Sequence, residues 1–112
     1  MKFLFSLSLS LFAVYTLNTN SLFSQEIDLN AGEQVFSQNC TVCHAGGENS
    51  VNSLKTLKIA DLEKYSKNSI EKIKYQVENG AGSMPAFADR LSEEEILNVA
   101  NFVLNQAKNE VW

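Results

Sequence analysis

The sequence predicts an all-α domain, and three observations support this fold class. Four segments place apolar residues at helical spacing, and no segment shows the alternation of a half-exposed strand. The last segment opens with Ser92 and Glu95, which form a capping box. The only proline, Pro85, lies in a glycine-containing loop, where it interrupts no helix. We therefore expect about four helices and no sheet.

The first two helices are expected on either side of a glycine-rich loop. The first covers Leu29–Gln38, where Asp28 can cap the free backbone N–H groups of the first turn. Leu29, Gly32, Val35 and Phe36 fall on one face of it. The second helix is short and covers Lys58–Lys64.

The third and fourth helices have the clearer boundaries. The third covers Ser69–Glu78, with Asn68 and Glu71 as a capping pattern and Gly80 as its stop. The fourth begins after Ser92, and three consecutive glutamates suit the positive end of its dipole. One face of this helix is apolar and is expected in the core: Ile96, Val99, Ala100, Val103 and Ala107.

The 112 residues allow one small domain behind a leader. An apolar run at residues 3–17 follows a single lysine, and small residues come next. This pattern predicts an export signal over residues 1–24, cleaved after Ser24 or alternatively after Ser21, and a domain over residues 25–112. A membrane anchor fits less well, because the run is shorter than the about 20 apolar residues of a span and contains serines.

The composition excludes one class of function. After the leader the chain has eight Lys and Arg against 13 Asp and Glu, a net charge of −5. An acidic chain is poorly suited to a nucleic-acid backbone, which is bound by cationic groups. A hydrophobic fraction of 45% favours a folded domain. Export often leads to an oxidising compartment, so the two cysteines are expected to be bonded.

One motif carries recognisable chemistry. Cys40-Thr41-Val42-Cys43-His44 is the Cys-x-x-Cys-His attachment signature of a c-type haem, in which each thiol forms a thioether and the histidine ligates the iron. Three alternatives stand beside it. A zinc site would need a further ligand. A redox thiol pair would need a preceding strand. A short disulfide could arise from a chance match.

The second axial ligand can be narrowed by elimination. His44 is the only histidine, and Met84 is the only methionine after the start residue. Met84 lies 40 residues further along, in the loop beside Pro85. A thioether ligand suits low-spin haem iron and raises its reduction potential. The alternative is a methionine that fills a gap in the core.

These residues carry a resemblance to a known family. Residues 40–47, Cys-Thr-Val-Cys-His-Ala-Gly-Gly, resemble class I cytochrome c. Further segments narrow the resemblance to the cytochrome c6 family: those around Asp28, Tyr75-Gln76-Val77-Glu78-Asn79-Gly80, Met84-Pro85-Ala86-Phe87, Arg90-Leu91-Ser92, the last helix and the terminal Trp112. It covers nearly all of the chain after the leader. It implies a small class I cytochrome c fold, with about four helices wrapped around one covalently bound haem c.

The resemblance also implies roles for individual residues. Cys40 and Cys43 would form the thioethers, and His44 and Met84 would be the axial ligands of the haem iron. Gln76 matches a haem-contact position, although a solvated helix residue is an equal alternative. Arg90 matches an arginine near the docking surface for photosystem I, with an ordinary surface charge as the alternative.

One segment departs from the family pattern. Residues 48–54 read Glu-Asn-Ser-Val-Asn-Ser-Leu, where the family often has Asn-x-Val-Ile and a proline. A backbone carbonyl from this region should accept the ring N–H of His44 and fix its orientation. The sequence leaves open which carbonyl does so.

The function implied by the resemblance is one-electron transfer and not enzymatic catalysis. The donor would be the cytochrome b6f complex, through its cytochrome f, and the acceptor photosystem I, in the thylakoid lumen of an algal chloroplast or a cyanobacterium. We expect a monomer with no stable membrane insertion after signal cleavage. One alternative is a periplasmic respiratory cytochrome c that donates to a terminal oxidase. Another is a ligand-binding haem sensor or small haem enzyme, which requires Met84 to leave the iron.

Overall fold

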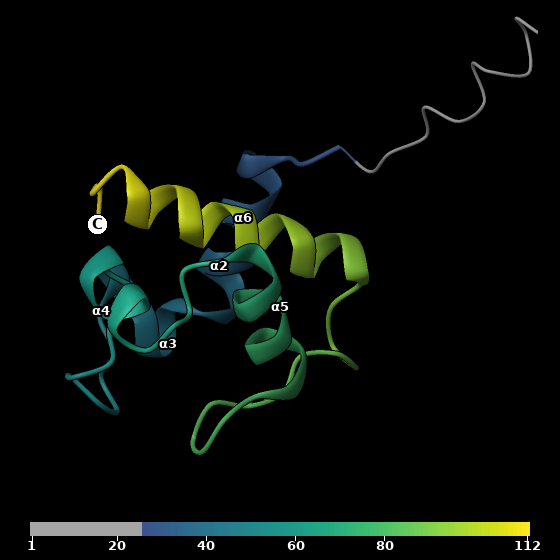
Figure 1. The fold of residues 1–112 in the computed structure, drawn as a ribbon. Coiled ribbons are helices and arrows are strands. Elements are labelled where there is room, and N and C mark those ends of the chain that lie inside the picture. The colour runs from purple at the N-terminus through teal and green to yellow at the C-terminus, as the bar shows by residue number, and fades with distance from the viewer. Residues whose placement is uncertain (1–25) are drawn as a thin grey trace, which may run out of the picture.

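The structure, a computed structural model, describes residues 26–112, so the predicted leader lies outside the described residues. Residues 26–112 form five α-helices, labelled in Figure 1, and a 3-10 turn, η2, at Ala45–Gly47. The α-helices are α2 (Leu29–Asn39), α3 (Thr41–His44), α4 (Ile59–Lys64), α5 (Ile70–Asn79) and α6 (Glu93–Lys108). Within residues 26–112 the extended pairing is limited to one isolated bridge, between Ala81 and Met84. The all-α class is therefore confirmed, with α3 added to the four expected helices.

Three helices begin at an N-cap residue whose side chain accepts a hydrogen bond from a free backbone N–H group of the first turn. Asp28 accepts from the backbone N–H of Ala31 at 3.0 Å at the start of α2. At α6, Ser92 and Glu95 form the predicted reciprocal capping box. The prediction of Asn68 as the cap of α5 is wrong by one residue. Ser69 is the cap, because its hydroxyl accepts from the N–H of Lys72.

The core lies where α6 crosses α2 and packs against α5 (Figure 1). A β-carbon added to Gly32 would lie 2.3 Å from the carbonyl oxygen of Asn98 and 2.9 Å from Cβ of Phe102. The two backbones can approach this closely only because Gly32 has no side chain. Next to this crossing, the rings of Phe36 and Phe102 pack with centroids 5.5 Å apart. Gly32 and Phe36 thus both contact the last helix.

The expected stripe on α6 is confirmed as part of the core. Val99 and Ala100 are 1% and 0% exposed. In the part of the chain that the structure describes, none of the helices is long and apolar enough to cross a membrane. Below α5 in Figure 1, the loop to α6 descends from the end of α5 and returns to the start of α6. This loop carries Met84 and forms part of the site.

Candidate haem site

A cavity of about 940 Å³ opens between the helices and brings the predicted site residues together. Its volume lies in the range of pockets that hold large ligands, about 300–1,000 Å³. Six of its lining residues are the candidates from the sequence: Cys40, Cys43, His44, Gln76, Met84 and Arg90. Several of its other lining residues belong to the apolar core: Phe36, Leu62, Ile73, Val77, Phe87, Val99 and Val103. The cavity is therefore an apolar hollow with thiol, imidazole and thioether groups along its lining.

The Cys-x-x-Cys-His motif folds as one helical turn at the end of α2. Cys40 is the C-cap of α2, and its carbonyl accepts from the N–H of His44 at 2.8 Å and of Cys43 at 3.2 Å. This turn brings both sulfurs and the imidazole to the same cavity. Five consecutive residues thus supply two attachment points and one ligand.

The alternatives for the two cysteines find no support. Neither Cys40 nor Cys43 is in a disulfide, and no strand precedes them in the part of the chain that is described. Within residues 26–112, no group of three or more His, Cys, Asp or Glu is arranged to hold a metal ion. Burial raises the pKa of the Cys40 thiol to about 11.

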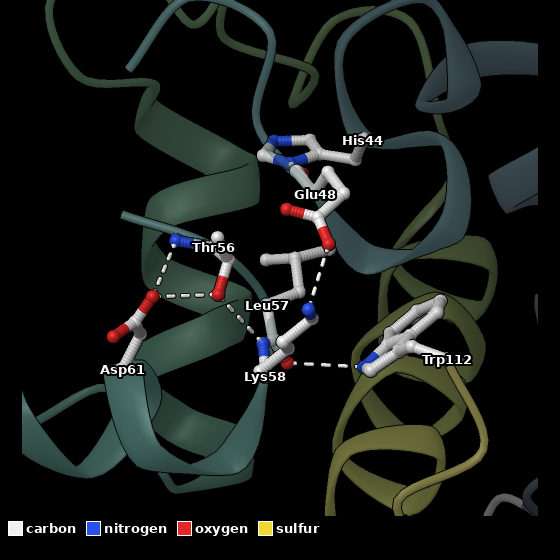
Figure 2. A network of polar contacts seen from close by, with 7 residues as sticks. All are labelled: His44, Glu48, Thr56, Leu57, Lys58, Asp61 and Trp112. Carbon is white, nitrogen blue, oxygen red and sulfur yellow. Dashed lines mark hydrogen bonds and ion pairs between the residues drawn. The ribbon is translucent and has the colours of Figure 1, made fainter. Parts of the chain in front are cut away.

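The imidazole of His44 is oriented by a backbone carbonyl. Nδ1 lies 2.8 Å from the carbonyl oxygen of Glu48 (Figure 2). Because a carbonyl only accepts, Nδ1 must carry the proton, and Nε2 keeps the lone pair that a metal ligand needs. This contact answers the question that the sequence left open in residues 48–54. The first residue of the divergent segment supplies the carbonyl.

A small polar network continues from Glu48 (Figure 2). Its carboxylate lies 2.8 Å from Nζ of Lys58, and this partner raises the pKa of Lys58. Further along, Asp61 accepts from the hydroxyl of Thr56 at 2.6 Å and from its N–H at 3.0 Å. These two hydrogen bonds lower the pKa of Asp61. They close the turn that leads into α4.

Met84 is placed by the end of α5 and by backbone pairing within its loop. Gly80 ends α5 with φ of 72°, and a β-carbon there would lie 2.5 Å from the carbonyl oxygen of Met84. Ala81 and Met84 exchange backbone hydrogen bonds of 3.1 and 2.9 Å. From α5, Nε2 of Gln76 donates to the sulfur of Met84 at 3.6 Å. Gln76 therefore touches the proposed ligand as well as lining the cavity.

Arg90 is exposed and lies at the cavity, with its guanidinium 5.5 Å from the centre of the Phe87 ring. Lys55 and Lys67 line the same cavity, and the single lining carboxylate is Asp61. The mouth is thus more positive than the chain as a whole. Of these residues, only Arg90 was singled out from the sequence, on resemblance. The lysines lie in a broad run of charged residues that gave no specific signal.

The residues that line the cavity fit a covalently held haem. Two thiols stand one helical turn apart, an imidazole presents a free Nε2, and a thioether faces the same apolar hollow. This fold and this site define a small c-type cytochrome. In agreement, residues 28–103 match the family model described as cytochrome c oxidase, cbb3-type, subunit III.

Curated relatives and a solved structure identify the family within the small c-type cytochromes. The chain is 49% identical to cytochrome c6 of Gracilaria tenuistipitata var. liui over 86% of this chain and 87% of that one. It is 50% identical to chloroplastic cytochrome c6 of Chlamydomonas reinhardtii over 94% of this chain and 72% of the relative. Cytochrome c6 of the diatom Phaeodactylum tricornutum superposes with a TM-score of 0.72 at 46% identity, covering 73% and 97% of the two chains. The chain belongs to the cytochrome c6 family.

Family membership settles the cofactor and the broad role. The Cys-x-x-Cys-His motif in a cytochrome c domain means a covalently attached haem c. Cytochrome c6 carries electrons in photosynthesis and is not an enzyme. The predicted family, fold class and cofactor are confirmed.

Proposed function

We propose that this chain accepts single electrons from the cytochrome b6f complex, through cytochrome f, and delivers them to photosystem I. One observation supports this most directly: the imidazole of His44 and the thioether of Met84 line one cavity, beside the two thiols of the motif. Two filled axial positions suit electron transfer, because they leave the iron no open position for a substrate.

Each of these residues has a separate task in this proposal. Cys40 and Cys43 would form the thioethers to the haem, and His44 and Met84 would supply the two ligands of its iron. The bound haem c supplies the one-electron exchange between ferric and ferrous iron. The hydrogen bond from Nδ1 of His44 to Glu48 fixes the ring plane and strengthens the ligand. The amide of Gln76 donates to the sulfur of Met84 and lines the cavity, where it would contact the haem.

The apolar lining keeps water away from the site. Val99 and Phe87 line the cavity and are 1% and 6% exposed. A shell of this kind lowers the local dielectric constant and disfavours the more highly charged oxidised state. Together with a methionine ligand, it favours a high reduction potential.

Docking to the acceptor is proposed to use the positive mouth of the cavity, with Arg90 as a contact. Arg90→Glu should slow transfer to photosystem I without moving the midpoint potential, because charge steers encounter while the ligands set the potential. Lys72→Glu is the matched control, since Lys72 is exposed and does not line the cavity. Flash photolysis over a salt series measures both rates. Equal rates for the two variants would remove Arg90 from the docking surface.

A respiratory carrier that donates to a terminal oxidase is the second candidate, because the matched family model is named after a subunit of a terminal oxidase. The haem chemistry would be the same for both candidate functions, so only the partner that accepts the electron distinguishes them. The test offers the reduced protein to isolated photosystem I and to a terminal oxidase under the same conditions. Faster oxidation by photosystem I supports the photosynthetic role, and faster oxidation by the oxidase contradicts it.

We further propose that residues 1–24 are removed on export and that the domain, residues 25–112, works as a monomer in the thylakoid lumen. The chloroplastic relative from Chlamydomonas supports this compartment over a bacterial periplasm. The intact mass of the purified holoprotein tests the cleavage. The mass of residues 25–112 plus one haem is expected, and the full-length mass would contradict the proposal.

A further inference from the structure

The last residue of the chain, Trp112, lies against the segments that flank the acceptor of the His44 ring N–H. Its Nε1–H donates to the carbonyl of Leu57 at 3.1 Å, across 55 residues of sequence (Figure 2). On another side, Gly47 is in close contact with the indole. A β-carbon added to Gly47 would lie 2.4 Å from Cγ of Trp112. Trp112 therefore touches both residue 47 and residue 57.

Those two residues are also bonded to each other. The N–H of Leu57 donates to the carbonyl of Gly47 at 2.7 Å. The next residue on each side forms the ion pair of Glu48 and Lys58 at 2.8 Å. The dipeptides 47–48 and 57–58 are thus joined by a backbone hydrogen bond and an ion pair. The Glu48 carbonyl that accepts from His44 is part of this pair of dipeptides.

Trp112 is itself held by the core. Its ring centroid lies 5.3 Å from that of Phe36 on α2 and 6.0 Å from that of Phe102 on α6. The indole therefore connects the crossing of α2 and α6 to the loop that carries Glu48. The ion pair alone cannot do this, because both of its side chains are 54% exposed and an exposed pair restrains little.

We propose that Trp112 is a positioning residue for His44. Its indole N–H and its contact with Gly47 hold the 47–48 and 57–58 dipeptides in place, and this fixes the carbonyl that orients the imidazole. The strength of that hydrogen bond determines how basic the ligand is. The inference rests on the proposed role of His44 as a ligand. The inference is tested by measuring how fast the ring N–H proton of His44 exchanges with solvent.

The first test replaces Trp112 with Phe, which keeps an aromatic ring against Phe36 and removes the N–H donor. Asn98→Ala is the matched control. Asn98 also gives a long-range side-chain bond to backbone, accepting from the N–H of Asp28 at 3.0 Å, at the α2–α6 crossing and away from His44. Exchange of the His44 Nδ1 proton with solvent is measured by NMR in the reduced holoprotein.

We expect roughly tenfold faster exchange of this proton in Trp112→Phe, from the loss of one hydrogen bond that keeps the loop closed. Asn98→Ala should leave the rate unchanged. Equal exchange in Trp112→Phe and the parent protein would overturn the inference, as would equal acceleration in both variants. A spectrum without methionine ligation would count against the proposed function and leave this inference standing.

A second pair of variants tests the contact with Gly47. Gly46 and Gly47 both have positive φ, 64° and 75°, so an alanine is strained at either position. At Gly47 the new methyl group would also displace Trp112, whereas at Gly46 it would meet nothing within 4 Å. Gly47→Ala should speed the exchange of the His44 proton well beyond Gly46→Ala. The same rate in both would contradict a role for Trp112.

Discussion

The two proposed ligands are held in different ways. His44 belongs to a single helical turn that also carries both cysteines, and its ring bonds to a carbonyl that is tied to the core through Trp112. Met84 sits in a loop after α5, held by backbone pairing with Ala81 and by one long contact from Gln76. The position of His44 is therefore restrained by several contacts. The Met84 side has fewer restraints, so we expect a change of iron ligation to occur there.

Removing both cysteines gives the largest expected effect, and it acts on the His44 side alone. Cys40→Ala combined with Cys43→Ala should abolish covalent haem, because no thioether can form. Denaturing electrophoresis followed by a haem stain measures this. Met84→Ala is the control and should keep its stained band. A stained band in the double variant would contradict the attachment assigned to these residues.

Met84→Ala tests the second proposed ligand of the haem iron. It should open the sixth position and lower the midpoint potential by a fraction of the roughly 0.8 V range that axial ligands span. The ferrous protein should then bind carbon monoxide rapidly, as a haem sensor does. Ser83→Ala is the control, because Ser83 lines the same cavity one residue earlier. An unchanged potential in Met84→Ala would show that this residue does not ligate the iron.

A pair of glycines tests how the Met84 loop is held. Gly80 and Gly82 have φ of 72° and 57°, and a β-carbon would meet the Met84 carbonyl only at Gly80. Gly82→Ala should cost about 1–2 kcal/mol from backbone strain. Gly80→Ala should cost about 2–5 kcal/mol, because overpacking adds to the strain. Chemical denaturation of the holoproteins measures both. Equal losses would mean that the loop does not depend on this close approach.

Asp61→Asn gives the smallest expected effect, at the turn behind the His44 side. Hydrogen bonds from Thr56 lower the pKa of Asp61 below its ordinary value of 3.8. The stability that its carboxylate contributes is thus fully present above pH 3.8 and is lost as the pH falls through the folded pKa. Thermal unfolding of the parent and of Asp61→Asn should differ at neutral pH and converge in acid. Asp89→Asn, at an exposed position, is the control, and a gap that persists in acid would contradict this assignment.

The sequence predicted those features that depend on neighbouring residues. The Cys-x-x-Cys-His motif is a spacing of five consecutive residues, and the caps at Asp28 and Ser92 bind backbone only three residues away. Met84 became the candidate second ligand by elimination, since the chain offers no second histidine, and it does line the same cavity as His44. These parts of the fold and the site could be predicted without coordinates.

Other features depend on contacts that leave no pattern in the sequence. The acceptor for His44 is a backbone carbonyl, and any residue at position 48 supplies one. The bond from Trp112 to Leu57 joins positions 55 residues apart. Helix α3 has four residues, too few for a periodic pattern. Asn68 and Ser69 are both good caps, and the prediction fell on Asn68, one residue before the cap that the structure has.

A spectroscopic redox titration of the purified holoprotein tests the central claim most directly, because it reports both ligands at once. Ligation by His44 and Met84 predicts a low-spin spectrum with a clearly positive midpoint potential. A high-spin spectrum or a negative midpoint potential would contradict the account, since Met84 would then not be bound to the iron.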